Sequence, residues 1–241
     1  MEKDKMYQIS TLQSLSMGYT RAVTTVKELL DHGDTGLGTF EDVNGEMIVV
    51  GGHCYRAAED GTVSKAPDDE GVPFASVAFL DEERTFEISD IDSIDKMKDL
   101  LDLKIEEWFG LNSMHIVKID GEFEKVSARS ESPYKSQHVS LKNILSETQK
   151  SFEFDNVEGT MICVYYPDYM DGINAPGWHL HFISADRSRG GHTFDLKLKR
   201  GIAVMDKLPR IEIQLPTEPA FDTYSLKQAS DDDIKKVEQG K

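Results

Sequence analysis

The sequence predicts an α+β protein with mixed, largely antiparallel β-sheets, a few packed helices and a metal site on strands of the C-terminal half. Many short apolar runs separated by turn residues predict strands, whereas few segments have helical periodicity. Strands and helices do not alternate regularly, which argues against a doubly wound parallel sheet. We expect residues 1–125 to form an N-terminal α/β region with a mixed sheet and residues 126–241 to form a β-rich region that carries the metal site.

Three segments have the apolar spacing of an amphipathic helix. The first covers residues 22–30. The second covers residues 94–108 and follows Ser93 or Asp92 as its N-cap. The third, residues 140–150, is shorter. We interpret the apolar stripes as faces that pack on the core.

Turn signals divide the β-rich remainder of the chain. Gly51-Gly52 is a two-residue hairpin signal, and Asp60-Gly61 and Asp120-Gly121 predict further turns. The expected strands are residues 47–50, 53–57, 74–80, 116–119, 123–128, 159–166, 178–184, 193–198 and 211–215.

The charge of the chain limits its partners. The formal net charge is −17 at pH 7, which argues against nucleic acid or an anionic membrane surface as a partner. An anionic substrate would need local positive charge in its site, which a metal ion and an arginine can supply. We expect most acidic residues in 81–107 and in the C-terminal tail to be solvated.

Compartment signals favour the cytoplasm. No segment approaches the roughly 20 apolar residues that span a bilayer, and residues 1–6 lack the apolar core of a signal peptide. Cys54 and Cys163 each lie in an apolar, strand-like run. We favour buried thiols in a reducing compartment. A disulfide between the two cysteines stays an open alternative. We therefore expect a cytoplasmic protein.

The most informative segment is WHLHF at 178–182, followed by GGH at 190–192. His179 and His181 lie on the same face of a strand, because strand side chains alternate. The polar, glycine-rich stretch before His192 predicts a turn, after which the next strand would return beside the first. Three converging imidazoles predict a catalytic zinc site with one open position. Alternatively, the first two are ordinary strand residues and His192 is a polar loop end.

Taken from the residues alone, Arg129, Glu46 and Glu238 are weaker candidates. Arg129 ends an expected strand and could clamp a carboxylate, although such an arginine is more often a surface residue. Glu46 opens a strand and Glu238 lies in the acidic tail, and each by itself is interpreted as a solvated carboxylate. The chain has no phosphate-binding glycine loop, dinucleotide fingerprint or nucleophile elbow, so neither NAD nor ATP is implied.

A longer pattern surrounds the histidines. It includes PDYMDGIN at 167–174, GWHLHFIS at 177–184, DR at 186–187, GTF at 38–40, GE at 45–46, VPFA at 72–75, IDG at 119–121 and PY at 133–134. Together these motifs resemble the bacterial alpha-acetolactate decarboxylase family over nearly the whole chain.

The resemblance implies an enzyme that converts 2-acetolactate (2-hydroxy-2-methyl-3-oxobutanoate) into (R)-acetoin and CO2 in acetoin and butanediol biosynthesis. Loss of CO2 leaves a carbanion that must be held as an enediolate. Without thiamine or pyridoxal, a zinc ion (Zn2+) can act as the electron sink. The resemblance implies that His179, His181 and His192 bind this ion and that the metal stabilises the enediolate. It also implies a homodimer.

The same resemblance assigns four further residues. Arg129 would orient the substrate carboxylate or stabilise developing charge. Glu46 or Glu238 would complete the coordination and transfer the proton that yields acetoin. Thr39, seven positions before Glu46, would contact the substrate together with Arg129. The expected substrate is therefore a small anionic hydroxy-keto acid.

Two other function classes stay open. A cupin-like metal-dependent oxygenase or isomerase also uses a His-x-His strand pair, but cupins usually have a glutamate shortly after it, and residues 182–186 contain none. A non-catalytic zinc or small-acid-binding domain would have its structural site closed by a fourth protein ligand. Release of CO2 from acetolactate, with and without a chelator, separates these classes.

Overall fold

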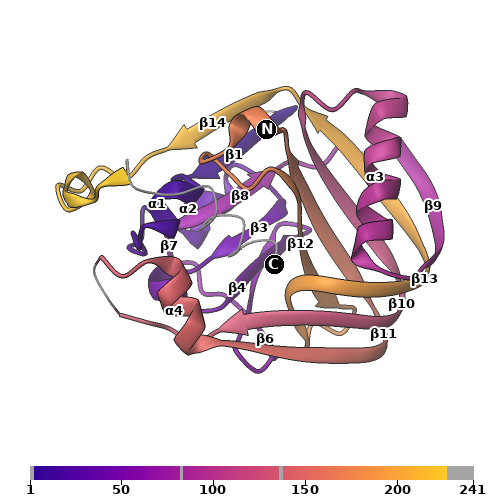
Figure 1. The fold of residues 1–241 in the computed structure, drawn as a ribbon, viewed down its shortest axis with the longest axis horizontal. Helices are drawn as coiled ribbons and strands as arrows, with labels where there is room; N and C mark the ends of the chain where they lie inside the picture. Colours follow the sequence, from indigo (N-terminus) through magenta and orange to yellow (C-terminus); the bar gives the residue numbers. More distant parts are fainter. Residues whose placement is uncertain (1–2, 82–83, 136–137, 227–241) are drawn as a thin grey trace.

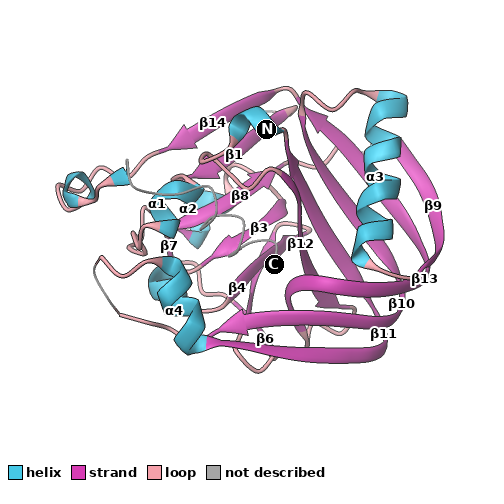
Figure 2. Cartoon of the chain, in the orientation of Figure 1, coloured by secondary structure: helices cyan, strands magenta, loops and turns pink. Residues whose placement is uncertain are grey.

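Two packed β-sheets form the body of the chain in the computed structural model, which describes residues 3–81, 84–135 and 138–226 (Figures 1 and 2). In the seven-stranded first sheet β1 and β14 are parallel, and the other pairings are antiparallel. In spatial order its strands are β14 (Arg210–Gln214), β1 (Lys5–Ile9), β8 (Phe74–Ala78), β3 (Thr35–Thr39), β4 (Glu46–Val50), β5 (His53–Ala57) and β6 (Val63–Lys65).

The five-stranded second sheet is antiparallel and contains the longest strands. Its order is β10 (Met114–Glu131), β11 (Gln149–Tyr166), β12 (Gly177–Ser184), β13 (Gly190–Leu208) and β9 (Arg84–Ile91). Since β10 also pairs with β13, the sheet curls back on itself. Two short strands, β2 (Thr24–Thr25) and β7 (Gly71–Val72), pair separately. The predicted mixed, largely antiparallel α+β fold is thus confirmed. Residue 125, the expected domain boundary, falls within β10, and the division into two domains stays a prediction.

The core lies between the sheets and under the longest helix. Buried apolar side chains of the first sheet, such as Met6 and Leu37, meet Ile116 and Val164 of the second. The helix α3 (Ile94–Trp108) covers the outer face of the second sheet (Figure 1). The second sheet is therefore buried on both faces, against the first sheet on one side and against α3 on the other. This burial of apolar surface holds the strands that carry the histidines in place.

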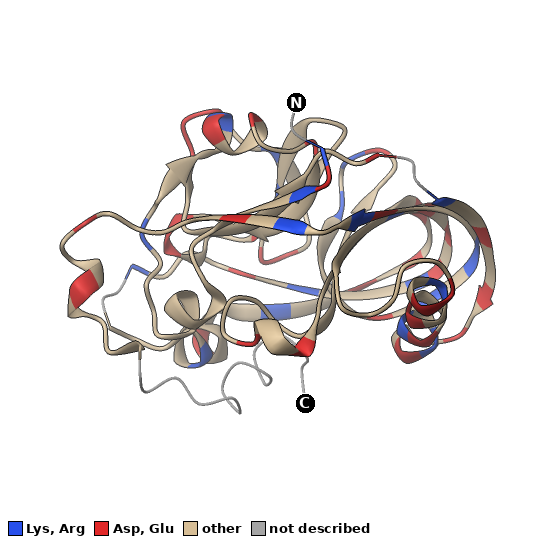
Figure 3. Cartoon of the chain, turned by 90° about the horizontal axis from the view of Figure 1, so that it is seen from above, with Lys and Arg blue, Asp and Glu red and all other residues tan. Residues whose placement is uncertain are grey.

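The helix α3 forms as the sequence predicts. The Ser93 side chain accepts a hydrogen bond from the Lys96 amide and caps the first turn, while Met97, Leu101 and Ile105 are buried. Figure 3 shows its charged residues of both signs spread along the helix, in keeping with the expected solvated acidic segment. Among the described residues, no helix combines the length and apolar composition that crossing a bilayer requires.

The hairpin and the third helix are also confirmed. Gly51 and Gly52 have φ values of +58° and +74° and join β4 to β5, a backbone shape that favours glycine at both positions. Inside the predicted segment 140–150, the helix α4 covers Leu141–Thr148. Further short helices are α1 (Leu12–Ser16), η1 (Glu41–Val43), η2 (Asp168–Met170) and η3 (Phe221–Thr223), and the sequence analysis had not identified α1.

The predicted helix over residues 22–30 is wrong in its first half. The helix α2 begins only at Val26 and ends at Leu30. Thr25 and Glu28 form a capping box, with the Glu28 amide donating to the Thr25 hydroxyl and the Thr25 amide donating to the Glu28 carboxylate. This cap stops the helix from extending toward the N-terminus, and the preceding residues pair with β7 instead.

The predicted turn at Asp120-Gly121 is also wrong, because β10 continues through it. Gly121 pairs with Gly159 on one side and Gly201 on the other. A Cβ at Gly121 would lie 2.7 Å from the Arg200 carbonyl oxygen. This glycine therefore allows β13 to approach closely, rather than reversing the chain.

Candidate active site

Two adjacent strands bring the three histidines together. β12 carries His179 and His181 on one face, and β13 places His192 directly opposite His181. One ring nitrogen from each histidine lies within 4.8 Å of the others. The structure thus confirms the predicted convergence, and the group can hold a metal ion.

Gly191 makes this convergence sterically feasible. A Cβ on Gly191 of β13 would lie 2.8 Å from the Arg129 carbonyl oxygen of β10 and 3.1 Å from the Phe152 ring of β11. The φ of Gly191 is +156°, which L side chains rarely adopt. The residue before His192 is therefore glycine for a packing reason, and it brings His192 opposite Arg129 in the ladder.

The outer partner of His181 fixes its tautomer. The Nδ1 of His181 donates to the Met47 carbonyl at 2.8 Å, which leaves its Nε2 with a lone pair. The Arg129 guanidinium can only donate, and its Nη2 lies 3.1 Å from Nε2 of His192. The other ring nitrogen of His192, Nδ1, lies 2.9 Å from Nε2 of His179 and faces the rest of the triad.

Ring nitrogens of the three histidines face one another at short range. The Nε2 atoms of His179 and His181 are 3.0 Å apart. Burial lowers the pKa of His179 to about 3 and also lowers the pKa of His181 well below its ordinary value, so both rings are neutral at neutral pH. Neutral imidazole nitrogens are the form in which histidine binds a metal ion. Tetrahedral zinc with bonds of about 2.0–2.1 Å holds its nitrogen ligands about 3.3 Å apart, which requires only a slight opening of this group.

Glu46 extends the site from the first sheet. Its carboxylate oxygens lie 3.4 Å from Nε2 of His181 and 4.0 Å from Nδ1 of His192. Glu46 pairs with Thr39 across the β3–β4 ladder. The hydroxyl of Thr39 donates to the Gly45 carbonyl at 2.9 Å, and this residue is buried. Glu46 is therefore close enough to act on the same ligand or metal as the histidines.

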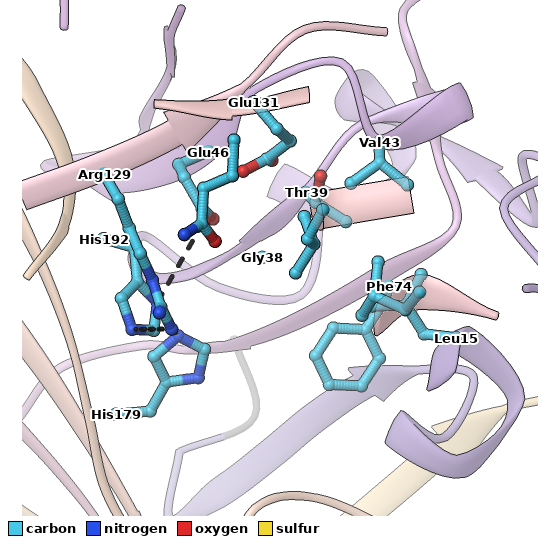
Figure 4. A pocket seen from close by; sticks show the side chains of 13 residues that line it. Leu15, Gly38, Thr39, Val43, Glu46, Phe74, Arg129, Glu131, His179 and His192 are labelled. Carbon is cyan, nitrogen blue, oxygen red and sulfur yellow. Dashed lines mark hydrogen bonds and ion pairs between the residues drawn. The ribbon is translucent and has the colours of Figure 1, made fainter. Parts of the chain in front are cut away.

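A cavity adjoins these groups, and it contains most of the predicted site (Figure 4). Thr39, Glu46, Arg129, His179 and His192 line it together. Arg129 is 8% exposed, so its charge acts in a largely water-free environment. The cavity thus combines metal-ligating nitrogens, a carboxylate and a buried guanidinium.

The sequence analysis missed two parts of this cavity. Glu131, 2% exposed, lines it two residues after Arg129 on the same face of β10. Strand alternation from Arg129 would have identified Glu131. The other missed part is an apolar wall, which comes from elements that are distant in the sequence: Leu15, Val43, Phe74, Leu141 and Leu145.

Glu238, the second glutamate expected in the site, lies outside the described residues. The described chain ends at Leu226, whose carbonyl accepts a hydrogen bond from the Gln13 side chain in α1. Nearby, Tyr224 stacks on His138 with ring centroids 4.1 Å apart. The last described residues therefore lie against α1 and against the loop before α4. Both α1 and α4 contribute side chains to the cavity wall.

Known proteins of one family match this chain over nearly its whole length. The model of the alpha-acetolactate decarboxylase family matches residues 6–228. An alpha-acetolactate decarboxylase of Methanosarcina mazei is 36% identical over 236 residues, which covers 98% of this chain and 81% of that protein. One of Lactococcus lactis subsp. lactis is 33% identical over 218 residues, or 90% of each.

Solved structures agree with the sequence matches. The crystal structure of alpha-acetolactate decarboxylase from Bacillus subtilis strain 168 superposes with a TM-score of 0.91 at 30% identity, covering 97% of this chain and 99% of that one. The match therefore includes both sheets and the strands that bear the histidines. The chain belongs to the alpha-acetolactate decarboxylase family and is accordingly an enzyme of the carboxy-lyase class.

Proposed function

We propose that this enzyme decarboxylates 2-acetolactate to (R)-acetoin and CO2, as a step of acetoin and butanediol biosynthesis. Family membership supports the substrate. The observation that carries the proposal is the cavity in which a histidine triad, a buried arginine and a glutamate converge. This set matches the needs of a small anionic hydroxy-keto acid that must lose CO2.

We propose zinc (Zn2+) as the metal, bound by His179, His181 and His192. The support is a set of three converging ring nitrogens, among which Nε2 of His181 has its lone pair directed into the group. When bound, the ion supplies Lewis acidity that draws electrons toward the ketone oxygen of the substrate. Neutral imidazoles suit this purpose because they leave the charge of the ion largely intact. Burial favours the neutral form of His179 and His181.

Arg129 binds the substrate carboxylate in this proposal. The chain has a formal net charge of −17, so an anionic substrate needs a local cation. The guanidinium of Arg129 lies beside His192, on the side of the cavity where the imidazoles converge. Its planar fork can hold a carboxylate in one orientation while the bond to the neighbouring carbon breaks.

The reaction then balances within the substrate and one carboxyl group. The bond between C2 and the carboxylate breaks, CO2 leaves, and the bonding electrons move toward the ketone oxygen to give an enediolate. A proton must be added to the carbon that lost CO2. Glu46 is suited to transfer this proton because its carboxylate reaches the cavity within 3.4 Å of a triad nitrogen. Thr39 lines the same cavity and would contact the substrate.

Glu238 is proposed as the second carboxyl group of the site. Its support is the place where the described chain ends, beside α1. Glu238 follows Leu226 by twelve positions (238 − 226). A chain of this length spans at most about 40 Å when fully extended, so a return to the cavity lies within reach. Glu46 and Glu238 would then divide metal coordination and proton transfer between them.

The test measures CO2 and acetoin formed from racemic acetolactate by the purified protein, with chelator and after zinc is added back. We expect both products in equal amounts, loss of activity on chelation and its recovery with zinc. Acetoin formation that is unaffected by complete removal of metal would refute the zinc role. Absence of both products from the zinc-loaded enzyme would refute the substrate.

Three further expectations accompany this function. We propose a cytoplasmic location, which is supported by two cysteines, Cys54 and Cys163, that are buried and not bonded to each other. We propose a homodimer, which light scattering of the purified protein tests. Separate expression of residues 1–125 and 126–241 tests the proposed division into two regions.

A further inference from the structure

The cavity has two chemically different walls. In Figure 4, His179, His192 and Arg129 lie on one side, and Leu15, Phe74 and Val43 lie on the other. Two leucines of α4 complete the apolar wall. The polar wall accounts for a carboxylate and two oxygens of a substrate, whereas nothing in the proposed chemistry yet uses the apolar wall.

The apolar wall is firmly packed from behind. Leu15, Val43, Phe74 and Leu141 are each no more than 4% exposed and belong to one cluster. Leu12, Ile144 and Ala175 support the same cluster. Its shape is therefore set by four separate chain segments, and it cannot retreat from a larger ligand without disturbing the core.

Leu145 differs from the rest of the wall. It follows Leu141 by one helical turn and lines the same cavity, but it is only partly buried. Truncating it would therefore enlarge the cavity while removing few core contacts. The cavity itself is small, about 40 Å³, so each methylene group added to a ligand changes how well the ligand fits.

We propose that this wall receives the alkyl substituent on C2 of the substrate and that Leu145 limits the length of this substituent. The proposal rests on the decarboxylase function described above. C2 of acetolactate is tetrahedral and carries a carboxylate, a hydroxyl, an acyl group and a methyl group. When the carboxylate, the hydroxyl and the acyl oxygen face the polar wall of Arg129 and the histidines, the methyl group points away from them, toward the apolar wall. Burial of apolar surface then stabilises the alkyl group in that position.

The test compares substrates with a methyl, an ethyl or a propyl group at C2. We expect kcat/KM of the wild type to fall by roughly 10-fold or more for a methylene group that the pocket cannot accommodate. Leu145→Ala should raise kcat/KM for the propyl substrate by roughly 10-fold relative to kcat/KM for the methyl substrate, because it opens the end of the wall. Leu145→Phe should make the fall steeper.

The matched control is Leu103→Ala, the same truncation at a residue of α3 that is 61% exposed. This variant should leave the ratio of kcat/KM for the propyl substrate to kcat/KM for the methyl substrate unchanged. If Leu145→Ala destabilises the fold, Leu145→Val provides a smaller opening with the same expected direction. An unchanged ratio in a folded Leu145 variant would overturn the proposal.

A binding series separates this proposal from the function on which it rests. The probes are 2-hydroxy-2-alkyl carboxylic acids, which keep the alkyl group, hydroxyl and carboxylate but lack the ketone and are not turned over. Their dissociation constants should show the same preference and the same change in Leu145→Ala. If the wild type fails to decarboxylate acetolactate but the binding series shifts as expected, the proposed reaction fails and the role of the wall stands. If the enzyme is active but the binding series does not shift, the wall inference fails alone.

Discussion

Replacement of His115 is predicted to remove an acid-sensitive contribution to stability. His115 is 0% exposed and lies between the rings of Phe109 and Tyr165, with centroid distances of 5.4 and 6.0 Å. Burial lowers its pKa from 6.5 to about 4. Below pH 6.5 the unfolded chain therefore takes up a proton at this position, while the folded chain stays neutral until about pH 4. The unfolded state binds more protons in this window, so stability falls as the pH falls.

The pKa difference gives the size of the effect. From pH 6.5 down to about 4, the lowered pKa of His115 corresponds to roughly 3 kcal/mol of unfolding free energy, of which about 2 kcal/mol is lost by pH 5. Urea denaturation of wild type and His115→Phe at pH 7 and pH 5 measures this. The wild type should lose about 2 kcal/mol more than the variant between the two pH values.

Subtracting the stability change of His115→Phe between the two pH values from that of the wild type cancels the carboxylate titrations that both proteins share. His53→Phe, at an exposed histidine, is the control and should follow the wild type. The reasoning is refuted if wild type and His115→Phe lose equal stability on acidification.

Variants at three further places test the site. Arg129→Lys keeps the charge but loses the bidentate fork, so steady-state kinetics should show kcat/KM at least about 10-fold lower; wild-type kinetics in Arg129→Ala would exclude Arg129 from the site. Gly191→Ala should lower the free energy of unfolding by about 1–3 kcal/mol from backbone strain, measured by urea denaturation, and also lower activity, since its Cβ collides with β10; unchanged stability would contradict the packing argument. Deletion after Ile234 should leave a folded, zinc-loaded protein with little activity, as should Glu238→Gln; normal turnover in both would assign the proton transfer to Glu46 alone.

The parts of the fold that the sequence predicts well depend on local signals. The cap at Ser93 and the stripe through Ile105 define α3, and Gly51-Gly52 defines the first hairpin. His179 and His181 share a face because of strand alternation, which needs no knowledge of the rest of the chain. Where a local signal was ambiguous the prediction failed, because Gly121 serves close packing of strands rather than a turn.

The rest of the site depends on contacts between distant segments. Glu46 and His181 are 135 positions apart (181 − 46) and meet only because β4 packs on β12. From the residues alone Glu46 looks like a solvated carboxylate, and only the family resemblance identified it. The apolar wall joins α1 to α4 in the same way. Side-chain periodicity describes one element at a time, so it cannot show which elements share a cavity.

The most direct test of the central claim is the metal content of the purified protein and of its histidine variants, measured by elemental analysis. We predict about one divalent ion per chain in the wild type and loss of both the ion and acetolactate decarboxylation in His179→Ala/His181→Ala, with the fold retained by circular dichroism. Full metal content together with wild-type activity in this folded double variant would contradict the account.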